Sequence, residues 1–134
     1  EDQPEVRYER RPVFVGPLEL RHPDREPGAQ LDRLAQVLEE PLGLHPLRLV
    51  RVAITPTEFE LFTAYGIQIK SRSPAVQTFV IQLTGSAGYL PTPRAVRGGG
   101  YSAVIQSSRV GPKGGQLLVE RTVEALRALW PKRQ

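Results

Sequence analysis

The run QTFVIQL, Gln77 to Leu83, and the sequence TGSAGYLPTPRAVRGGG that follows it constrain the fold more than any other part of this chain. The run carries no charge and is rich in β-branched and aromatic residues, which predicts a strand. In the following segment, Thr84 to Gly100, glycines permit positive φ and prolines fix φ, so this loop should hold a defined shape. Loops of this length are typically functional or disordered.

The remaining hydrophobic pattern predicts strands that alternate with helices. Strands are expected at Val13–Val15, His45–Ile54 and Tyr101–Ser107. Helices are expected over Gln30–Glu40 and Gln116–Leu129, and over a segment that Thr57 N-caps and that carries Phe59, Phe62, Tyr65 and Ile69 on one side. The alternation favours an α/β fold, a mixed sheet with flanking helices. The apolar strands Leu47–Ile54 and Gln77–Leu83 should be adjacent and central.

Composition narrows the function classes. With 134 residues the chain is one domain or a fragment of one. Its net charge of +4 comes from 18 basic and 14 acidic residues that are interspersed, so we expect no nucleic-acid partner. It has no cysteine for disulfides or thiolate chemistry and no apolar run long enough for a transmembrane segment.

The absence of methionine suggests a longer parent. The chain begins with Glu1, and removal of an initiator methionine normally requires a small following residue. We therefore expect a processed product or an excised piece, whose function belongs to a longer polypeptide.

Several short motifs favour local structure over chemistry. GPKGGQ lacks the spacing of a phosphate-binding loop, and a helix start explains it better. His22 and His45 are 23 positions apart with no acid spaced to complete a metal site. Ser102, Ser107 and Ser108 have no neighbouring base. None of these residues is expected to be a nucleophile or a metal ligand.

Glu60 stands apart because it is expected in the first turn of a helix at the exit of a buried strand. Ligands of α/β proteins bind beyond the carboxyl ends of strands, so a carboxylate here suits a binding site. A favourable interaction with the helix dipole explains the same position, and spacing alone favours that interpretation.

The chain resembles a known family over residues 45–130. The segments RLVRVAITPTEFELFTAYGIQIKSRSP, QTFVIQL, GYLPT, GGGYSA and VGPKGGQLLVERTVEAL follow one another as in the C-terminal part of the catalytic region of neutral/alkaline ceramidase-like proteins, closest to the bacterial branch. Residues 1–44 form a variable lead-in with one expected helix. The chain is thus expected to be part of a larger α/β catalytic domain.

The resemblance implies a zinc-dependent amidohydrolase that cleaves the amide of a sphingoid base. In that family zinc is held by two N-terminal histidines, a glutamate and a tyrosine, and the nucleophilic serine is also N-terminal. Glu60 matches the glutamate through its spacing to Leu61, Phe62, Ile69 and Lys70. The loop with Ser86, Tyr89 and Tyr101 would then form one wall of the active-site cleft.

The remaining part of the enzyme is implied to lie elsewhere. The upstream part of the same polypeptide, or a companion chain, would supply the other wall, so this chain alone should be inactive and hold no tightly bound zinc. The resemblance implies a lipid or other small-molecule amide as substrate. Family members are often exported, which points weakly to an extracytoplasmic location.

The sequence departs from the family at two positions. Ceramidases have Asn-x-Tyr where this chain has Thr84, Gly85 and Ser86, so Tyr89 matches the second tyrosine of that loop and not the metal-binding one. Phe59 precedes Glu60 where those enzymes have glycine. Two hypotheses follow: the C-terminal segment of a ceramidase-like hydrolase, or a non-catalytic binding or scaffold module that has lost the metal.

Overall fold

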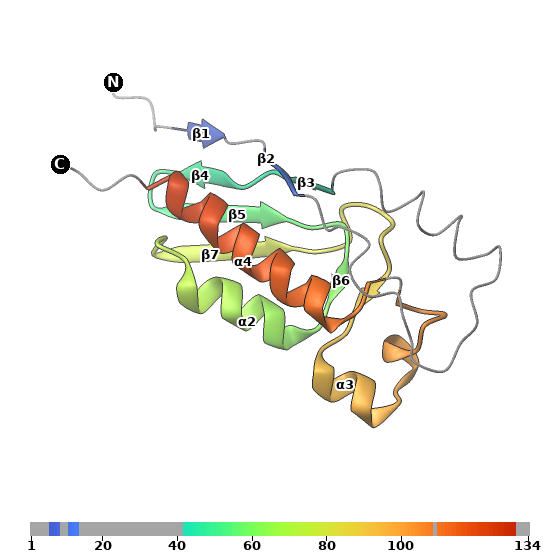
Figure 1. The fold of residues 1–134 in the computed structure, drawn as a ribbon. Coiled ribbons are helices and arrows are strands. Elements are labelled where there is room, and N and C mark those ends of the chain that lie inside the picture. Colours follow the sequence, from blue (N-terminus) through green and yellow to red (C-terminus); the bar gives the residue numbers. More distant parts are fainter. Residues whose placement is uncertain (1–5, 9–10, 14–41, 109, 131–134) are drawn as a thin grey trace, which may run out of the picture.

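A mixed four-stranded sheet organises the computed structural model, which describes residues 6–8, 11–13, 42–108 and 110–130 (Figure 1). Its strands are β1 (Val6–Tyr8), β4 (Leu47–Leu49), β5 (Val52–Pro56) and β7 (Gln77–Ile81), in the order β1-β4-β5-β7. The pairs β1–β4 and β4–β5 are antiparallel, whereas β5 and β7 are parallel. This arrangement, with helices beside the sheet, confirms the expected α/β fold.

Two short ladders and four helical segments complete the described structure. The ladder β2–β3 is antiparallel and the ladder β6–β8 is parallel. Their bounds are β2 Arg11–Val13, β3 Leu42–Leu44, β6 Glu60–Leu61 and β8 Tyr89–Leu90. The helical segments are α2 (Thr63–Arg72), α3 (Pro93–Gly98), the 3-10 helix η1 (Tyr101–Ala103) and α4 (Pro112–Ala128).

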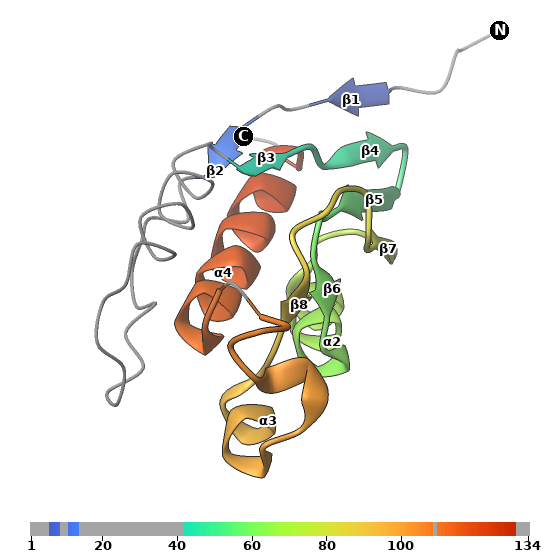
Figure 2. The same cartoon turned by 90° about the vertical axis from the view of Figure 1, so that its right-hand side faces the viewer.

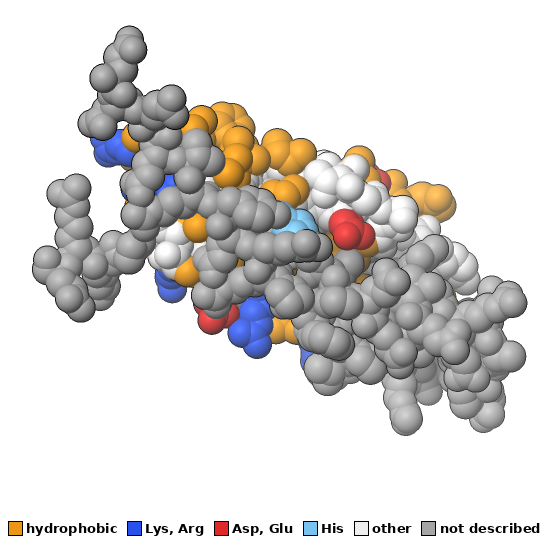
Figure 3. Space-filling model, turned by 90° about the horizontal axis from the view of Figure 1, so that it is seen from above, with side chains coloured by type: hydrophobic (Ala, Val, Ile, Leu, Met, Phe, Trp, Pro, Cys, Tyr) orange, Lys and Arg blue, Asp and Glu red, His pale blue; other side chains and the backbone are white. Residues whose placement is uncertain are grey.

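Both long helices cover the same face of the sheet (Figures 1 and 2). Alternation along β5 and β7 buries Ala53, Thr55 and Thr78 on this side. On the opposite side Phe79 and Ile81 remain 48% and 45% exposed. Figure 3 shows hydrophobic side chains along the part of the molecule that lies behind the sheet in Figure 1. Among the described elements, no helix covers this second face.

Helix α4 is held at its C-terminal end by Arg48 of β4. The Arg48 Nη1 atom donates a 2.8 Å hydrogen bond to the Leu129 carbonyl, and its guanidinium lies 4.7 Å from the Trp130 ring centroid. A positive charge at this end interacts favourably with the helix dipole, and its position near the indole ring adds a cation–π interaction. Val123, on the side of α4 expected to face the core, is 1% exposed, which confirms that this side is buried.

No helix of the described residues is long and apolar enough to cross a membrane.

Tyr65 of α2 joins three parts of the chain. Its hydroxyl donates to the Pro91 carbonyl at 2.9 Å and lies 3.1 Å from the Pro112 carbonyl, at the start of α4. The ring fills the space beside Gly115, where an added Cβ would lie 2.5 Å from the Tyr65 ring and hydroxyl. Burial raises the pKa of Tyr65 to about 12. The GPKGG sequence therefore forms a helix start with room for this ring.

Three expected elements are wrong in form. The segment His45–Ile54 contains two antiparallel strands, because Val50 turns the chain with a φ of 55°, which is rare for a β-branched residue. The helix does not begin after Thr57: the Glu60 amide bonds to the Gly88 carbonyl, so residues 60–61 form β6 and α2 begins at Thr63. Tyr101–Ser107 begins with η1 instead of a strand.

Other expectations hold in part. Strand β7 lies beside β5 as expected, but it is the last strand of the sheet order and not a central one. Helix α4 begins four residues before the expected Gln116, because Pro112 is suited to a first turn. Val13 is the last residue of β2, while the rest of the expected strand Val13–Val15 and the helix Gln30–Glu40 lie outside the described residues.

Replacement of Tyr65 tests its role in the fold. Tyr65→Phe should lower the free energy of unfolding by about 1–3 kcal/mol, because loss of the hydroxyl removes the donor of the buried hydrogen bond to the Pro91 carbonyl. The raised pKa also predicts that wild-type stability falls between pH 10 and 12, where the unfolded chain releases the phenolic proton first. Urea unfolding across this range measures both effects.

The matched control is Tyr101→Phe, because Tyr101 is 76% exposed. It should leave the urea midpoint at neutral pH unchanged. An alkaline loss of equal size in Tyr65→Phe would show that another group causes it.

Candidate functional site

The ladder β6–β8 places Glu60 directly beside Tyr89. These two residues are register partners in the parallel pair, as are Leu61 and Leu90. The Glu60 amide donates to the Gly88 carbonyl at 2.9 Å. Leu90 is fully buried, so its packing holds the ladder in this register. Glu60 and Tyr89 are 29 positions apart in the sequence, and the pairing makes them neighbours.

The shaped loop returns to the same place through Gly88 and Ser107. Gly88 has a φ of 77°, a conformation that favours glycine. The next amide, of Tyr89, donates to the Ser107 carbonyl at 3.2 Å, and Gly88 bridges Ser108. Residues 101–108 are therefore folded back onto β8, which brings η1 to the Glu60–Tyr89 pair.

Tyr89 is the centre of a small polar cluster, made by Glu60, Tyr89, Tyr101 and Ser102. The Glu60 charge raises the pKa of the Tyr89 phenol above its ordinary value; desolvation and a hydrogen bond with Glu60 add to this, and one with Ser102 opposes it. The Tyr101 ring packs edge-on against Tyr89, with centroids 6.1 Å apart. At neutral pH the phenol is therefore protonated and suited to donate to the Glu60 carboxylate.

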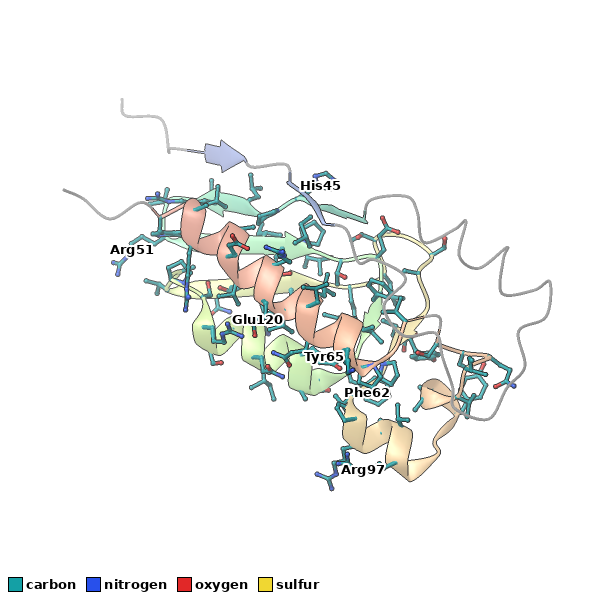
Figure 4. All side chains as sticks on the ribbon, viewed as in Figure 1. His45, Arg51, Phe62, Tyr65, Arg97 and Glu120 are labelled. Carbon is teal, nitrogen blue, oxygen red and sulfur yellow. The ribbon has the colours of Figure 1, made fainter. Side chains whose placement is uncertain are left out.

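An open pocket of about 310 Å³ adjoins this cluster. It lies between the start of α2, helix α3 and η1, and Tyr101 and Ser102 belong to both the cluster and the pocket wall. Phe62 lies between the start of α2 and α3 in Figure 4. The lining consists of Phe62, Ala95, Gly98, Gly100, Tyr101, Ser102 and Ala103. Since none of these side chains is charged, the pocket suits a neutral group.

The expected site residues are brought together only in part. Glu60, Tyr89 and Tyr101 lie in one cluster, whereas Ser86 is exposed in the loop before β8 and no described contact joins it to Glu60. His45 lies in the link between β3 and β4, on the other side of the molecule from Phe62 (Figure 4). His22 lies outside the described residues.

Two residues near the site could not be recognised from the sequence. Ser102 was unremarkable because it has no neighbouring base, yet η1 places it beside Tyr89. Glu58 extends over the loop, and its side chain lies 2.7 Å from where a Cβ on Gly85 would stand. The small residues of TGSAG were the available signal, since they permit such a close approach.

The described residues contain no group of three His, Cys, Asp or Glu that could hold a metal ion. The ion pairs between described residues, Arg72–Glu120 and Arg121–Glu124, involve α2 and α4 and do not include Glu60. The described interaction of the Glu60 carboxylate is with the Tyr89 phenol.

Comparison with known proteins found no family model, no curated protein and no solved structure that matches this chain.

The Tyr89 titration tests the cluster. Glu60→Gln should lower the pKa of Tyr89, because it removes the negative charge that opposes phenolate formation. Carbon-13 NMR of the tyrosine ζ carbons follows each phenol separately. Glu58→Gln, the matched control, should leave Tyr89 unchanged. An equal shift in both variants would contradict a specific Glu60–Tyr89 interaction.

Proposed function

We propose that this chain is the C-terminal segment of a neutral ceramidase-like, zinc-dependent amidohydrolase and forms one wall of its active-site cleft. The observation that carries the proposal is the Glu60–Tyr89 pair beside an uncharged pocket. Glu60 is the residue that the family resemblance assigns to the metal. It lies beside the pocket between α2, α3 and η1, which the described residues line on one side and leave accessible to a further polypeptide segment.

The described residues fit part of a zinc site. Structural and catalytic zinc takes three or four protein ligands, and the cluster offers one carboxylate. Glu60 would be that ligand, and Tyr89 would orient it from behind, since ligating carboxylates are themselves hydrogen-bonded. Bound zinc would act as a Lewis acid toward the amide carbonyl. The remaining ligands would come from the upstream part of the same polypeptide or from a companion chain.

The pocket supports an amide with an apolar substituent as substrate. Phe62 and Ala95 supply apolar wall, and Ser102 and Tyr101 supply hydroxyl groups. The scissile amide and the acyl or sphingoid chain next to it are uncharged. Their binding against an uncharged pocket wall therefore buries no charged group and carries no desolvation penalty for a charge. In this proposal α3 and η1, which line the pocket, would position this end near Glu60.

The sheet face that no described helix covers supports the proposal of a larger catalytic domain. Parallel strand pairs are normally covered on both faces. Here Leu49, Phe79 and Ile81 are 40–48% exposed on the face away from the helices. A further polypeptide layer would bury these side chains and complete the domain that the resemblance implies.

A binding or scaffold module without metal is the alternative. Phe59, which stands where the ceramidases have glycine, is 2% exposed and part of the core. Ser86, which stands at the metal-binding tyrosine, is exposed. Both observations favour a fold that is retained without the metal site, and zinc content separates the two functions.

Zinc titration of the chain tests how the ligands are divided. Calorimetry should detect no stoichiometric zinc uptake, because one carboxylate and hydroxyl groups bind zinc weakly. Uptake at a ratio of one that is lost in Glu60→Gln and kept in Glu58→Gln would contradict this. His22 or His45 would then complete a site within the chain.

Activity of the complete assembly tests the function itself. An affinity tag after Gln134, introduced in the source cell, recovers the chain with any polypeptide joined or bound to it. We expect zinc and hydrolysis of a fluorescent N-acyl sphingosine, lost more than about 100-fold in Glu60→Gln because a ligand should exceed the effect of outer partners. Glu58→Gln should retain activity. A zinc-free, inactive assembly would favour the binding module, and a zinc-containing assembly that leaves the amide intact would contradict the substrate.

A further inference from the structure

The outer edge of β7 is uncovered by any described strand. β7 is the last strand in the order β1-β4-β5-β7. The Ile81 carbonyl accepts from the Thr57 amide at 2.8 Å, beyond the last pair of the β5–β7 ladder, so the backbone of Ile81 faces β5. Backbone groups alternate in direction along a strand, which turns those of Val80 and Gln82 to the open edge. QTFVIQL carries no charge and no proline, the usual protections of an edge.

A groove runs between this edge and α2. It has a volume of about 210 Å³ and is lined by Leu61, Phe62, Thr63, Gly66, Ile67, Lys70, Val80 and Gln82. Thr63, Gly66, Ile67 and Lys70 follow helical spacing, so they lie on one side of α2. The other lining includes Val80 of β7 and Gln82, which directly follows β7, and the backbone of both faces outward. One wall is therefore a strand edge with free hydrogen-bonding groups, and the other is a helix.

The groove combines apolar side chains with polar ones, and Lys70 gives it one positive charge. Ile67 is 60% exposed, and a Cβ added to Gly66 would meet nothing within 4 Å. Lys70 is exposed, and the ion pairs between described residues do not include it. An occupant therefore needs apolar side chains for Ile67 and Val80 and a negative charge for Lys70.

We propose that β7 and α2 form a strand-addition site that binds an extended peptide segment with alternating apolar residues and one acidic residue opposite Lys70. Added strands gain affinity from main-chain hydrogen bonds and specificity from alternate side chains. Charge complementarity argues against a second copy of β7 as the occupant, because QTFVIQL contains no acid and a symmetric contact would bring two lysines together. The inference is independent of the metal site.

Selection from a displayed library of random heptapeptides on the immobilised chain tests the proposal. Enriched peptides should alternate apolar residues and carry an acid. Gly66→Leu should weaken their binding at least tenfold, because the new side chain fills the groove without a clash in the free chain. Gly98→Leu, the same change at another helical glycine with open space around it, should bind as wild type.

Charge reversal and amide exchange identify the binding mode. Lys70→Glu should change the preference of the selected peptides from acidic to basic residues, while Arg94→Glu on α3 should not. By NMR, the Val80 amide should exchange rapidly in the free chain and slow at least tenfold with the strongest selected peptide. Equal binding by Gly66→Leu, or selection of no peptide, would overturn the proposal. Val80 protection that rises with protein concentration alone would identify a second copy instead.

Discussion

The packing of Tyr65 against the start of α4 is the interaction on which the rest of the structure depends. Its hydroxyl donates to the Pro91 carbonyl and lies 3.1 Å from the Pro112 carbonyl, and its ring occupies the space that Gly115 leaves free. One buried side chain thus connects α2, the segment after β8 and α4. Such a buried hydroxyl is costly to leave unsatisfied, so these three segments are fixed relative to one another.

The position of the candidate site follows from this junction. Pro91 comes directly after β8, so fixing its carbonyl also fixes the strand that carries Tyr89. Glu60 lies opposite Tyr89 in the ladder, and η1 folds back to add Ser102 and Tyr101. The polar cluster therefore stands on short, loop-like elements that a buried core holds from behind, an arrangement typical of functional sites.

The described residues form two different surfaces that are suited to contact another polypeptide segment. The sheet face with Phe79 and Ile81 exposes large apolar side chains, which suits a broad covering layer. The groove between β7 and α2 is narrow and carries Lys70, which suits a single extended strand. Both surfaces involve β7, yet they use opposite sets of its alternating residues, so one can be occupied without the other.

The sequence by itself determined the α/β class, the strand at Gln77 and the amphipathic helix α4, because apolar periodicity and turn residues act locally. It misplaced the start of α2, since Thr57 and Glu58 are good helix-start residues and only the pairing of β6 with β8 draws residues 60–61 into an extended form. The sequence around the turn at Val50 contains no glycine or asparagine, the residues that would have predicted a positive φ there. Tertiary structure alone decided that Tyr89 meets Glu60, that Tyr101 and Ser102 meet Tyr89, and that β7 is an edge strand. Contacts between residues far apart in the chain depend on strand order and register, which local pattern does not encode.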